Sequence, residues 1–259
     1  PPLPDPRNPT MPSFPEKWHD LRLAVLDVET TGLEPEDDRI IEIGIVTFEE
    51  AEVDEVYGQL IDPQQPLPDD VTELTGITES DLEGKPTFEE VADEVHNRLT
   101  GVGIGAYNLD FDKDFVEAEL QRAGYEWPEE SPTFDPLVFA RQFFKDQRRK
   151  NLGTIADLLD IPLEEAHRAT HDAKVAGHIL YAFSDRLPEN LEDLMVLQAQ
   201  WEQEQARDRA SWRGEEEASE TLSSALGDDV GLGPAYIYGD EPDPLRALYR
   251  SVPEAADDS

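Results

Sequence analysis

The order of strand-like and helix-like segments constrains the fold of this chain most. Residues 21–29, 40–48 and 53–62 are apolar or alternate apolar with polar side chains, which is typical of β-strands. Short strand-like segments near 101–108 and 132–136 follow, and helical patterns alternate with them. Three consecutive strands followed by alternating strands and helices predict an α/β domain in which a mixed sheet is flanked by helices.

The helical segments carry recognisable start and stop signals. Residues 87–99 begin with Thr87 followed by acidic residues, which is typical of a helix N-terminus. Residues 151–161 stop before Pro162, where a helix is expected to end. Residues 169–187 form a long amphipathic pattern, so we expect the folded domain to finish with a long helix.

Composition divides the chain into four segments. Residues 1–16 contain seven prolines, so we predict a disordered, Pro-rich arm at 1–18. The folded domain is predicted at 19–184, followed by a helical extension with little apolar surface at 185–217. From Ala218 the chain is rich in Gly, Pro and acids, and we predict a largely disordered acidic tail at 218–259.

The charge of the chain is extreme, with 60 acidic and 21 basic residues and a net charge of −39. This excess either reflects a salt-rich cytosol or simply an acidic protein with acidic tails. It argues against nonspecific DNA binding, because affinity for phosphates normally comes from Lys and Arg. Cysteine is absent, which excludes disulfides and thiolate metal sites. No apolar run reaches about 18 residues and no signal-peptide core is visible, so we expect a cytoplasmic protein without a membrane span.

Two acids stand at the end of the first predicted strand. Asp27 and Glu29 are two positions apart, and alternate residues of a strand project from the same face. Two carboxylates placed together beside a buried strand repel each other and lose water, which is costly unless a positive charge holds them. The pair therefore suggests a bound cation.

Further acids and a histidine lie at similar positions in the predicted fold. Asp112 lies at the junction of a short strand and a helix, and His167 and Asp172 lie where a loop runs into the long helix. Oxygen ligands suit Mg²⁺ or Mn²⁺, and two such ions about 4 Å apart can clamp both oxygens of a displacement at phosphorus. A histidine beside them can take a proton from water because its pKa is near neutral.

These residues resemble the motifs of the DEDDh 3′–5′ exonucleases, the DnaQ-type group that includes the proofreading epsilon subunit of bacterial DNA polymerase III. The first motif is similar to LDVETTGLEPEDDRIIEIGIV, the second to AYNLDFD and the third to HRATHDA. The resemblance runs from about Leu21 to Phe183. It implies a ribonuclease H-like fold with a five-stranded mixed sheet, two Mg²⁺ or Mn²⁺ ions per active site, and 5′-mononucleotides as products.

The resemblance also implies roles for individual residues. The metal ligands would be Asp27, Glu29, Asp112 and Asp172, with His167 as the general base. The substrate-binding residues would be Thr30, Thr31, Leu33, Asp70, Thr75 and Asn108.

Two positions depart from the family pattern. Thr75 stands where the proofreading subunit has a histidine, and Tyr107 precedes Asn108 where histidine is common, which weakens the assignment to proofreading. Asp110 is either an outer ligand or solvent-exposed, and His171 is expected to lie on a helix face rather than act as the base.

Two segments suggest partners. The basic residues of 140–150 either contact DNA phosphates or form a solvated loop; they are Arg141, Lys145, Arg148, Arg149 and Lys150. The apolar residues of the C-terminal extension either dock on a DNA polymerase or pack back on the domain; they are Leu194, Met195, Leu197, Trp201 and Trp212.

The leading interpretation is a metal-dependent 3′–5′ exonuclease that removes nucleotides from the 3′ end of DNA, with single-stranded DNA as the expected substrate and proofreading beside a polymerase as one role. The alternative is a standalone exonuclease acting on single-stranded DNA or RNA ends in repair or RNA trimming. An inactive binding module with the same fold is a third class, and the intact set of five motif residues argues against it.

Overall fold

The computed structural model describes residues 14–163 and 167–226. Its centre is a five-stranded sheet with the order β3-β2-β1-β4-β5. An antiparallel meander is formed by β1 (Leu23–Thr30), β2 (Ile40–Glu49) and β3 (Glu52–Leu60). The short strands β4 (Gly103–Gly105) and β5 (Thr133–Phe134) extend the sheet in parallel to β1. The predicted mixed five-stranded sheet flanked by helices is confirmed.

The burial of the strands explains their sequences. β2 is buried along nearly its whole length, which fits its almost continuous apolar run. β3 is the edge strand and is mostly exposed or half-buried, which fits its alternating acids. β1 is buried except at Asp27, so the central strand carries its first acid where the buried run is interrupted.

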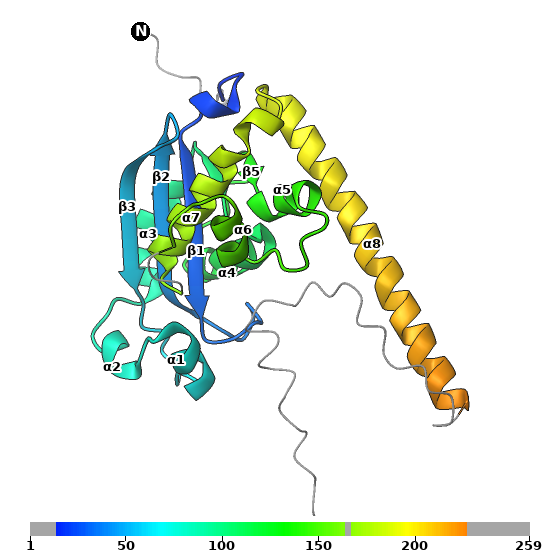
Figure 1. Cartoon of the computed structure of the whole chain (residues 1–259). Helices are drawn as coiled ribbons and strands as arrows, with labels where there is room; N and C mark the ends of the chain where they lie inside the picture. The colour runs from blue at the N-terminus through cyan, green and yellow to red at the C-terminus, as the bar shows by residue number, and fades with distance from the viewer. Residues whose placement is uncertain (1–13, 164–166, 227–259) are drawn as a thin grey trace, which may run out of the picture.

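Helices cover both faces of the sheet (Figure 1). On one face, α3 (Phe88–Leu99) and α4 (Leu109–Arg122) enclose a core that contains Leu26 and Ile43. On the other face a second core contains Val25 and is formed with helices α5 (Pro136–Phe143), α6 (Leu152–Leu158) and α7 (Ala169–Ala182). The short helices α1 (Asp69–Thr75) and α2 (Glu79–Leu82) lie beyond the end of the sheet at which β1 ends.

The long helix is shorter than predicted and is followed by separate elements. α7 ends at Ala182 instead of residue 187, and a 3₁₀ turn, Ser184–Arg186, follows it. The C-terminal helix α8, Leu191–Leu226, is 36 residues long and extends away from the domain (Figure 1). It passes the predicted boundary at residue 217 because the next residues contain no Pro or Gly before Gly227, and lengthening a helix costs less than starting one.

The first turns of α8 pack on the folded domain. Leu194 is fully buried, and Met195 and Trp201 pack against the core that contains α7. Of the two alternatives for the C-terminal extension, docking on a polymerase or packing on its own domain, the second therefore holds for Leu194, Met195 and Trp201. The side chain of Trp212 lies outside the described part of the structure. Residues 227–259 of the predicted tail also lie outside the described residues.

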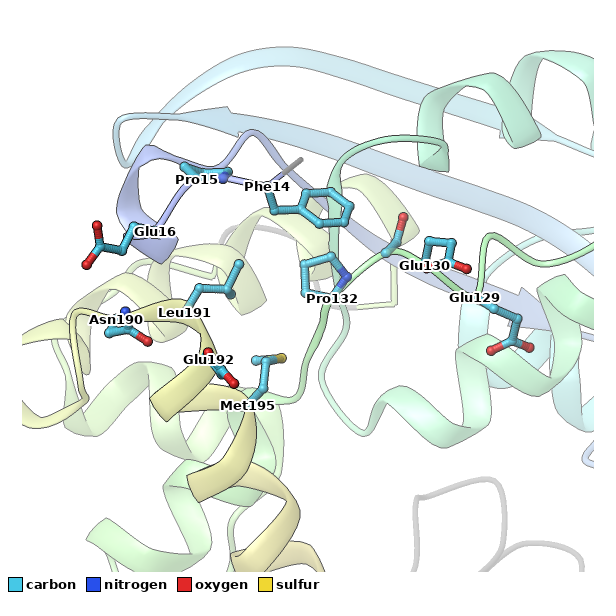
Figure 2. Close-up of a pocket in the computed structure, with 11 residues that line it drawn as sticks. Phe14, Pro15, Glu16, Glu129, Glu130, Pro132, Asn190, Leu191, Glu192 and Met195 are labelled. Atoms are coloured by element: carbon cyan, nitrogen blue, oxygen red, sulfur yellow. The ribbon is translucent and has the colours of Figure 1, made fainter. Parts of the chain in front are cut away.

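Residues 14–18, which the sequence predicts to be part of the Pro-rich arm, belong to the fold. Trp18 is buried, and its Nε1–H donates to the carbonyl of Pro188 at 3.0 Å. Burying a large indole outweighs the extended preference of the neighbouring prolines. A shallow groove lies between this segment, the residues before β5 and the start of α8, lined in part by Phe14, Pro132 and Met195 (Figure 2). Residues 1–13 lie outside the described chain.

No helix in the described part of the chain is both long enough and apolar enough to cross a membrane.

Candidate active site

The two acids of β1 lie on the face of the sheet that α7 covers. Leu23 and Val25, which share this face with Asp27 and Glu29, belong to the core formed with α7. Asp27 is half-buried and Glu29 is 5% exposed. The strand periodicity thus places both carboxylates beneath the helix that carries Asp172.

Asp112 reaches the same strand from the first turn of α4. β4 pairs with β1 only as far as Val25, so beyond this point β1 has no β4 partner. The Asp112 carboxylate takes that place: the backbone N–H of Val28, which lies between Asp27 and Glu29, donates to its Oδ1 at 3.0 Å. Asp112 is 4% exposed. One hydrogen bond therefore sets a third carboxylate beside the strand pair.

The N-terminus of α7 lies directly on β2. A Cβ atom at Gly44 would lie 2.3 Å from the backbone carbon of Ala169, so only glycine permits this approach. Gly44 pairs with Asp27 across the β1–β2 ladder. The close approach therefore brings the start of α7 to the position of the acidic pair.

Glu29, His167 and Asp172 form a compact group. One potential ligand atom from each lies within 4.8 Å of the other two. This is close to the roughly 4 Å that separates opposite ligands around one octahedral Mg²⁺. Asp27 and Asp112 are not members of this group of described residues. The structure thus brings together one strand acid, one helix acid and the predicted base.

Asp172 shows the electrostatic character of the site. Its Oδ2 accepts the backbone N–H of His167 at 3.0 Å, whereas its buried Oδ1 accepts no hydrogen bond in the described structure. Burial raises the pKa of the Asp172 carboxyl, and the neighbouring His167 opposes this shift. A buried carboxylate oxygen without a donor is a suitable ligand for a hard cation.

An ion pair between the exposed Arg168 and the buried Glu42 holds the segment that carries His167. Glu42 is 3% exposed and lies opposite Glu29 in the register of β1 and β2. It accepts from Arg168 Nη2 at 2.9 Å and from the backbone N–H of Ala169 at 3.3 Å. His167, one residue earlier, has a φ of 63°, a left-handed conformation uncommon for a residue other than Gly. Glu42 therefore anchors the turn on which the predicted base stands.

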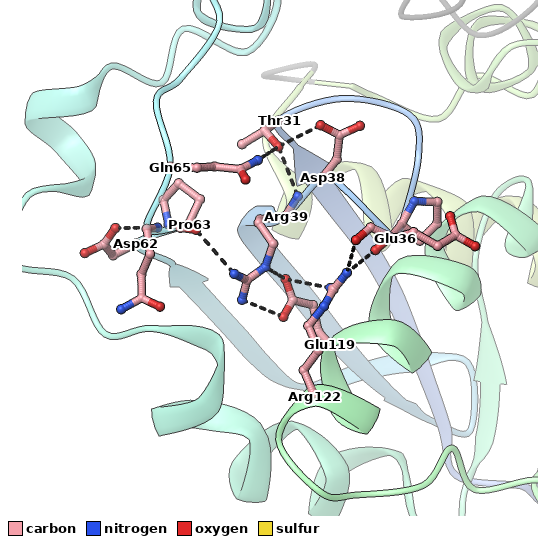
Figure 3. A network of polar contacts seen from close by, with 11 residues as sticks. Thr31, Glu36, Asp38, Arg39, Asp62, Pro63, Gln65, Glu119 and Arg122 are labelled. Atoms are coloured by element: carbon pink, nitrogen blue, oxygen red, sulfur yellow. Dashed lines mark hydrogen bonds and ion pairs between the residues drawn. The ribbon is translucent and has the colours of Figure 1, made fainter.

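The last residue of β1 and the loop after it, residues 31–39, carry three of the predicted substrate-binding residues. Thr30 and Thr31 are buried and Leu33 is half-buried. The Thr31 hydroxyl donates to Asp38 Oδ1 at 3.2 Å and accepts from Gln65 Nε2 at 2.7 Å (Figure 3). The threonine hydroxyls therefore stabilise the loop itself, and the Thr30 hydroxyl likewise donates to the carbonyl of Gly32 at 2.6 Å.

The same loop is tied to α4 by a buried salt bridge (Figure 3). Arg39 donates to both carboxylate oxygens of Glu119, from Nε at 2.6 Å and from Nη2 at 2.9 Å. Arg122 lies 3.5 Å from the same carboxylate and donates to the carbonyls of Pro35 and Glu36. The helix that carries Asp112 is therefore joined to the predicted nucleotide-binding loop.

The other predicted substrate residues lie apart from this loop. Asp70 and Thr75 belong to α1, where the Thr75 hydroxyl donates to the carbonyl of Val71 at 2.9 Å. Asn108 precedes α4 in a left-handed conformation, with a φ of 71°. Asp110, the additional acid of this motif, is exposed.

The basic residues of segment 140–150 differ in their exposure to solvent. Lys145, Arg148 and Arg149 are exposed, whereas Arg141 is half-buried and its Nη1 lies 3.5 Å from Gln205 Oε1. Lys150 donates to the carbonyl of Gln147 at 2.6 Å. The exposed part fits a surface that meets phosphates, and the buried part fits a packing role.

Several supporting residues are absent from the sequence-based prediction. Glu42 interrupts an apolar run, which is a usable signal for a buried, paired acid. Asp135 precedes Pro136, the pattern of a helix N-cap, and it does cap α5. No local pattern marks the partners Arg39 and Glu119, which are 80 residues apart.

Comparison with known proteins matches residues 24–180 to the exonuclease family model, RNase_T. The chain is 34% identical over 162 residues to the PolC-type DNA polymerase III of Halalkalibacterium halodurans, covering 62% of this chain and 11% of that protein. It is 34% identical over 167 residues to the 3′-5′ exonuclease DinG of Bacillus subtilis, covering 64% of this chain and 18% of that protein. The chain thus spans less than a fifth of these relatives.

Solved structures show the same fold. Exonuclease X in complex with 5′-overhanging duplex DNA aligns with a TM-score of 0.56 and 19% identity, over 68% of this chain and 99% of that one. E. coli exonuclease I in complex with a dT13 oligonucleotide aligns with a TM-score of 0.57 and 18% identity, over 64% of this chain and 41% of that one.

Proposed function

This chain belongs to the exonuclease (RNase_T) family, and from that premise we propose that it is a metal-dependent 3′–5′ exonuclease that hydrolyses DNA from its 3′ end. The observation that carries the proposal is the convergence of Glu29, His167 and Asp172 within 4.8 Å, together with a buried Asp172 oxygen that accepts no hydrogen bond in the described structure. A cluster of carboxylates beside an imidazole suits hydrolysis at phosphorus.

The site fits divalent metal ions with oxygen preference. Asp27, Glu29, Asp112 and Asp172 would hold two Mg²⁺ or Mn²⁺ ions. Bound there, such ions neutralise phosphate charge, lower the pKa of water and stabilise the departing oxygen. The chain's own contribution is to fix the carboxylates: Asp112 through Val28, and Asp172 through the backbone of His167.

His167 is proposed as the general base that accepts the proton of the attacking water. Its ring lies with Glu29 and Asp172, and Glu42 holds the neighbouring Arg168. A neutral imidazole suits this role near physiological pH. His171 lies on α7, and the proposed reaction does not use it.

The 3′-terminal nucleotide is proposed to bind against the loop after β1. Thr30 and Thr31 would offer backbone groups, since their hydroxyls already bind within the protein, and Leu33 would contact the base. Asn108 lies at the start of α4 on the Asp112 side. Asp70 and Thr75 would contact the substrate from α1, which lies beyond the same end of the sheet.

The substrate is proposed to be the 3′ end of single-stranded DNA, and the role to be proofreading beside a DNA polymerase. Similarity to PolC-type DNA polymerase III supports this role. Similarity to DinG, which is named a 3′-5′ exonuclease, supports the alternative of an exonuclease that works without a polymerase, in repair or in trimming of RNA ends. A polymerase partner would bind through the part of α8 that extends away from the domain.

Degradation of end-labelled substrates tests the proposal. Single-stranded DNA labelled at its 5′ end is incubated with Mg²⁺, with Mn²⁺ or with EDTA, and labelled RNA is run beside it. We expect a ladder that shortens from the 3′ end with either metal and disappears with EDTA. Asp172→Asn should abolish the ladder, whereas Asp157→Asn, at an exposed acid of α6, should retain it. A wild-type protein that yields no metal-dependent ladder would overturn the proposal.

A further inference from the structure

A glutamine of α8 is buried at the end of β5, outside the family match of residues 24–180. Gln198 is 4% exposed. Its Oε1 accepts the backbone N–H of Asp135 at 3.1 Å, and its Nε2 donates to the carbonyl of Thr133 at 3.2 Å. The side-chain amide thus satisfies backbone groups on either side of Phe134, as a neighbouring strand would.

Asp135 in turn organises the start of α4. Its carboxylate is buried and accepts three backbone N–H groups: Asn108 at 3.0 Å, Leu109 at 3.3 Å and Leu137 at 2.8 Å. The N–H of Leu137 belongs to α5, so this one carboxylate links the starts of two helices. A buried carboxylate with several donors is held in a narrow range of positions.

The start of α4 determines where Asp112 lies. Asn108 adopts its left-handed conformation directly before the helix, and Asp112 follows in the first turn. Asp112 Oδ1 accepts from Val28 between the two acids of β1. A shift of the Asn108 backbone would therefore move a carboxylate of the candidate site.

We infer that Gln198 is a positioning residue, through which α8 fixes Asp135, the start of α4 and hence the Asp112 carboxylate. The inference rests on the proposed function, and it makes the C-terminal helix a part of the site's support in this chain. Without Gln198, the buried N–H of Asp135 and the carbonyl of Thr133 would both lose their described partner, and the end of β5 would loosen.

α8 offers a matched control for this contact. Gln205 also uses its side-chain amide to hold the domain: Nε2 donates to the carbonyl of Val138 at 2.9 Å. This contact fixes α8 to α5 without touching Asp135. A general loosening of α8 should therefore appear in both variants, whereas a positioning effect on α4 should appear in Gln198→Leu alone.

Amide hydrogen exchange of the metal-free protein gives a readout that does not depend on nuclease activity. In Gln198→Leu we expect the amides of Asn108 and Leu109 to exchange about 10-fold faster than in wild type, and in Gln205→Leu at the wild-type rate. Gln198→Ala removes the same side-chain amide without a bulky replacement, so its amides at 108–109 should also exchange faster than in wild type. This variant serves if the leucine variant fails to fold.

Metal binding and turnover complete the test. Mn²⁺ binding measured by calorimetry should weaken about 10-fold in Gln198→Leu, as should kcat, with KM for DNA nearly unchanged. Unchanged exchange at residues 108–109, or equal effects in Gln205→Leu, would overturn the inference. A wild-type protein that neither binds Mn²⁺ nor degrades DNA would instead refute the proposed function, and the exchange data would still test the link from α8 to α4.

Discussion

The candidate site has two halves that are supported differently. The strand half, Asp27, Glu29 and Asp112, is backed by the central sheet and by a helix that buried polar contacts hold in place. The helix half, His167 and Asp172, stands at the N-terminus of α7, where Glu42 anchors the preceding turn. Both halves therefore stand on elements that pack in the hydrophobic core, but their polar supports differ. The strand half is held through the buried Glu119, whereas the turn before α7 is held through Arg168, an exposed partner of Glu42.

The difference suggests how the two halves will respond to mutation. Changes to the supports of the strand half should lower the free energy of unfolding together with activity, because those supports are buried charges. Changes at His167 should lower activity with little effect on stability, because this residue is half-buried and its proposed role is that of the general base.

The largest expected effect is on turnover. His167→Ala should lower kcat by roughly 10²- to 10⁴-fold, the usual contribution of a general base. His171→Ala, four residues further along, should retain most of the activity. Single-turnover degradation of labelled DNA measures both, and thermal melts confirm that both variants fold. The reverse ranking of the two histidines would show that the base is misassigned.

The next effect concerns the buried ion pair of the strand half. Arg39→Met leaves Glu119, whose side chain is 1% exposed, with Arg122 at 3.5 Å as its remaining described cation. We expect the free energy of unfolding to fall by about 3 kcal/mol, because an uncompensated charge stays buried. Urea denaturation provides the measurement.

A surface ion pair provides the control for that substitution. Arg22 pairs with Asp54 at 2.7 Å and lies 3.9 Å from Glu49, and the three side chains are 44%, 40% and 62% exposed. Arg22→Met should cost less than about 1 kcal/mol. Equal losses in the two variants would mean that burial does not distinguish the supports of the strand half.

The smallest expected effect is a pH dependence that originates at Asp135. Burial raises the pKa of this carboxyl to about 6, against hydrogen bonds from Asn108 and Leu137 that lower it. In the unfolded chain the pKa of this carboxyl is about 3.9. Between these values the native state binds more protons than the unfolded state, so the stability contributed by Asp135 is present below pH ~4 and is lost as pH rises through about 6.

Asp135→Asn removes this titration. Between pH 4 and pH 7 the wild type should therefore lose roughly 2–3 kcal/mol of unfolding free energy relative to the variant. Above pH 7 the difference between the two proteins should stay constant. Denaturation at a series of pH values measures it. A difference that does not change with pH would show that Asp135 is ionised throughout this range.

Periodicity along the chain was sufficient to predict the sheet, its flanking helices and the positions of the acids. Alternation in β1 places Asp27 and Glu29 on one face, and the apolar run of β2 predicts a strand buried on both faces. These features depend only on residues close together in the sequence, so a short stretch of sequence is enough to predict them. The helix boundaries were less predictable: α8 passes residue 217, and α7 stops at Ala182.

The supports of the site could not be read in this way, because each joins residues that are distant in sequence. Arg39 meets Glu119 across 80 residues, and Gln198 meets Asp135 across 63. Glutamine or glutamate in an acid-rich helix carries no signal of such a contact. The sequence specifies which side chains are available and which face of an element they occupy, whereas burial and pairing depend on how the helices pack on the sheet, since desolvation makes a distant partner necessary.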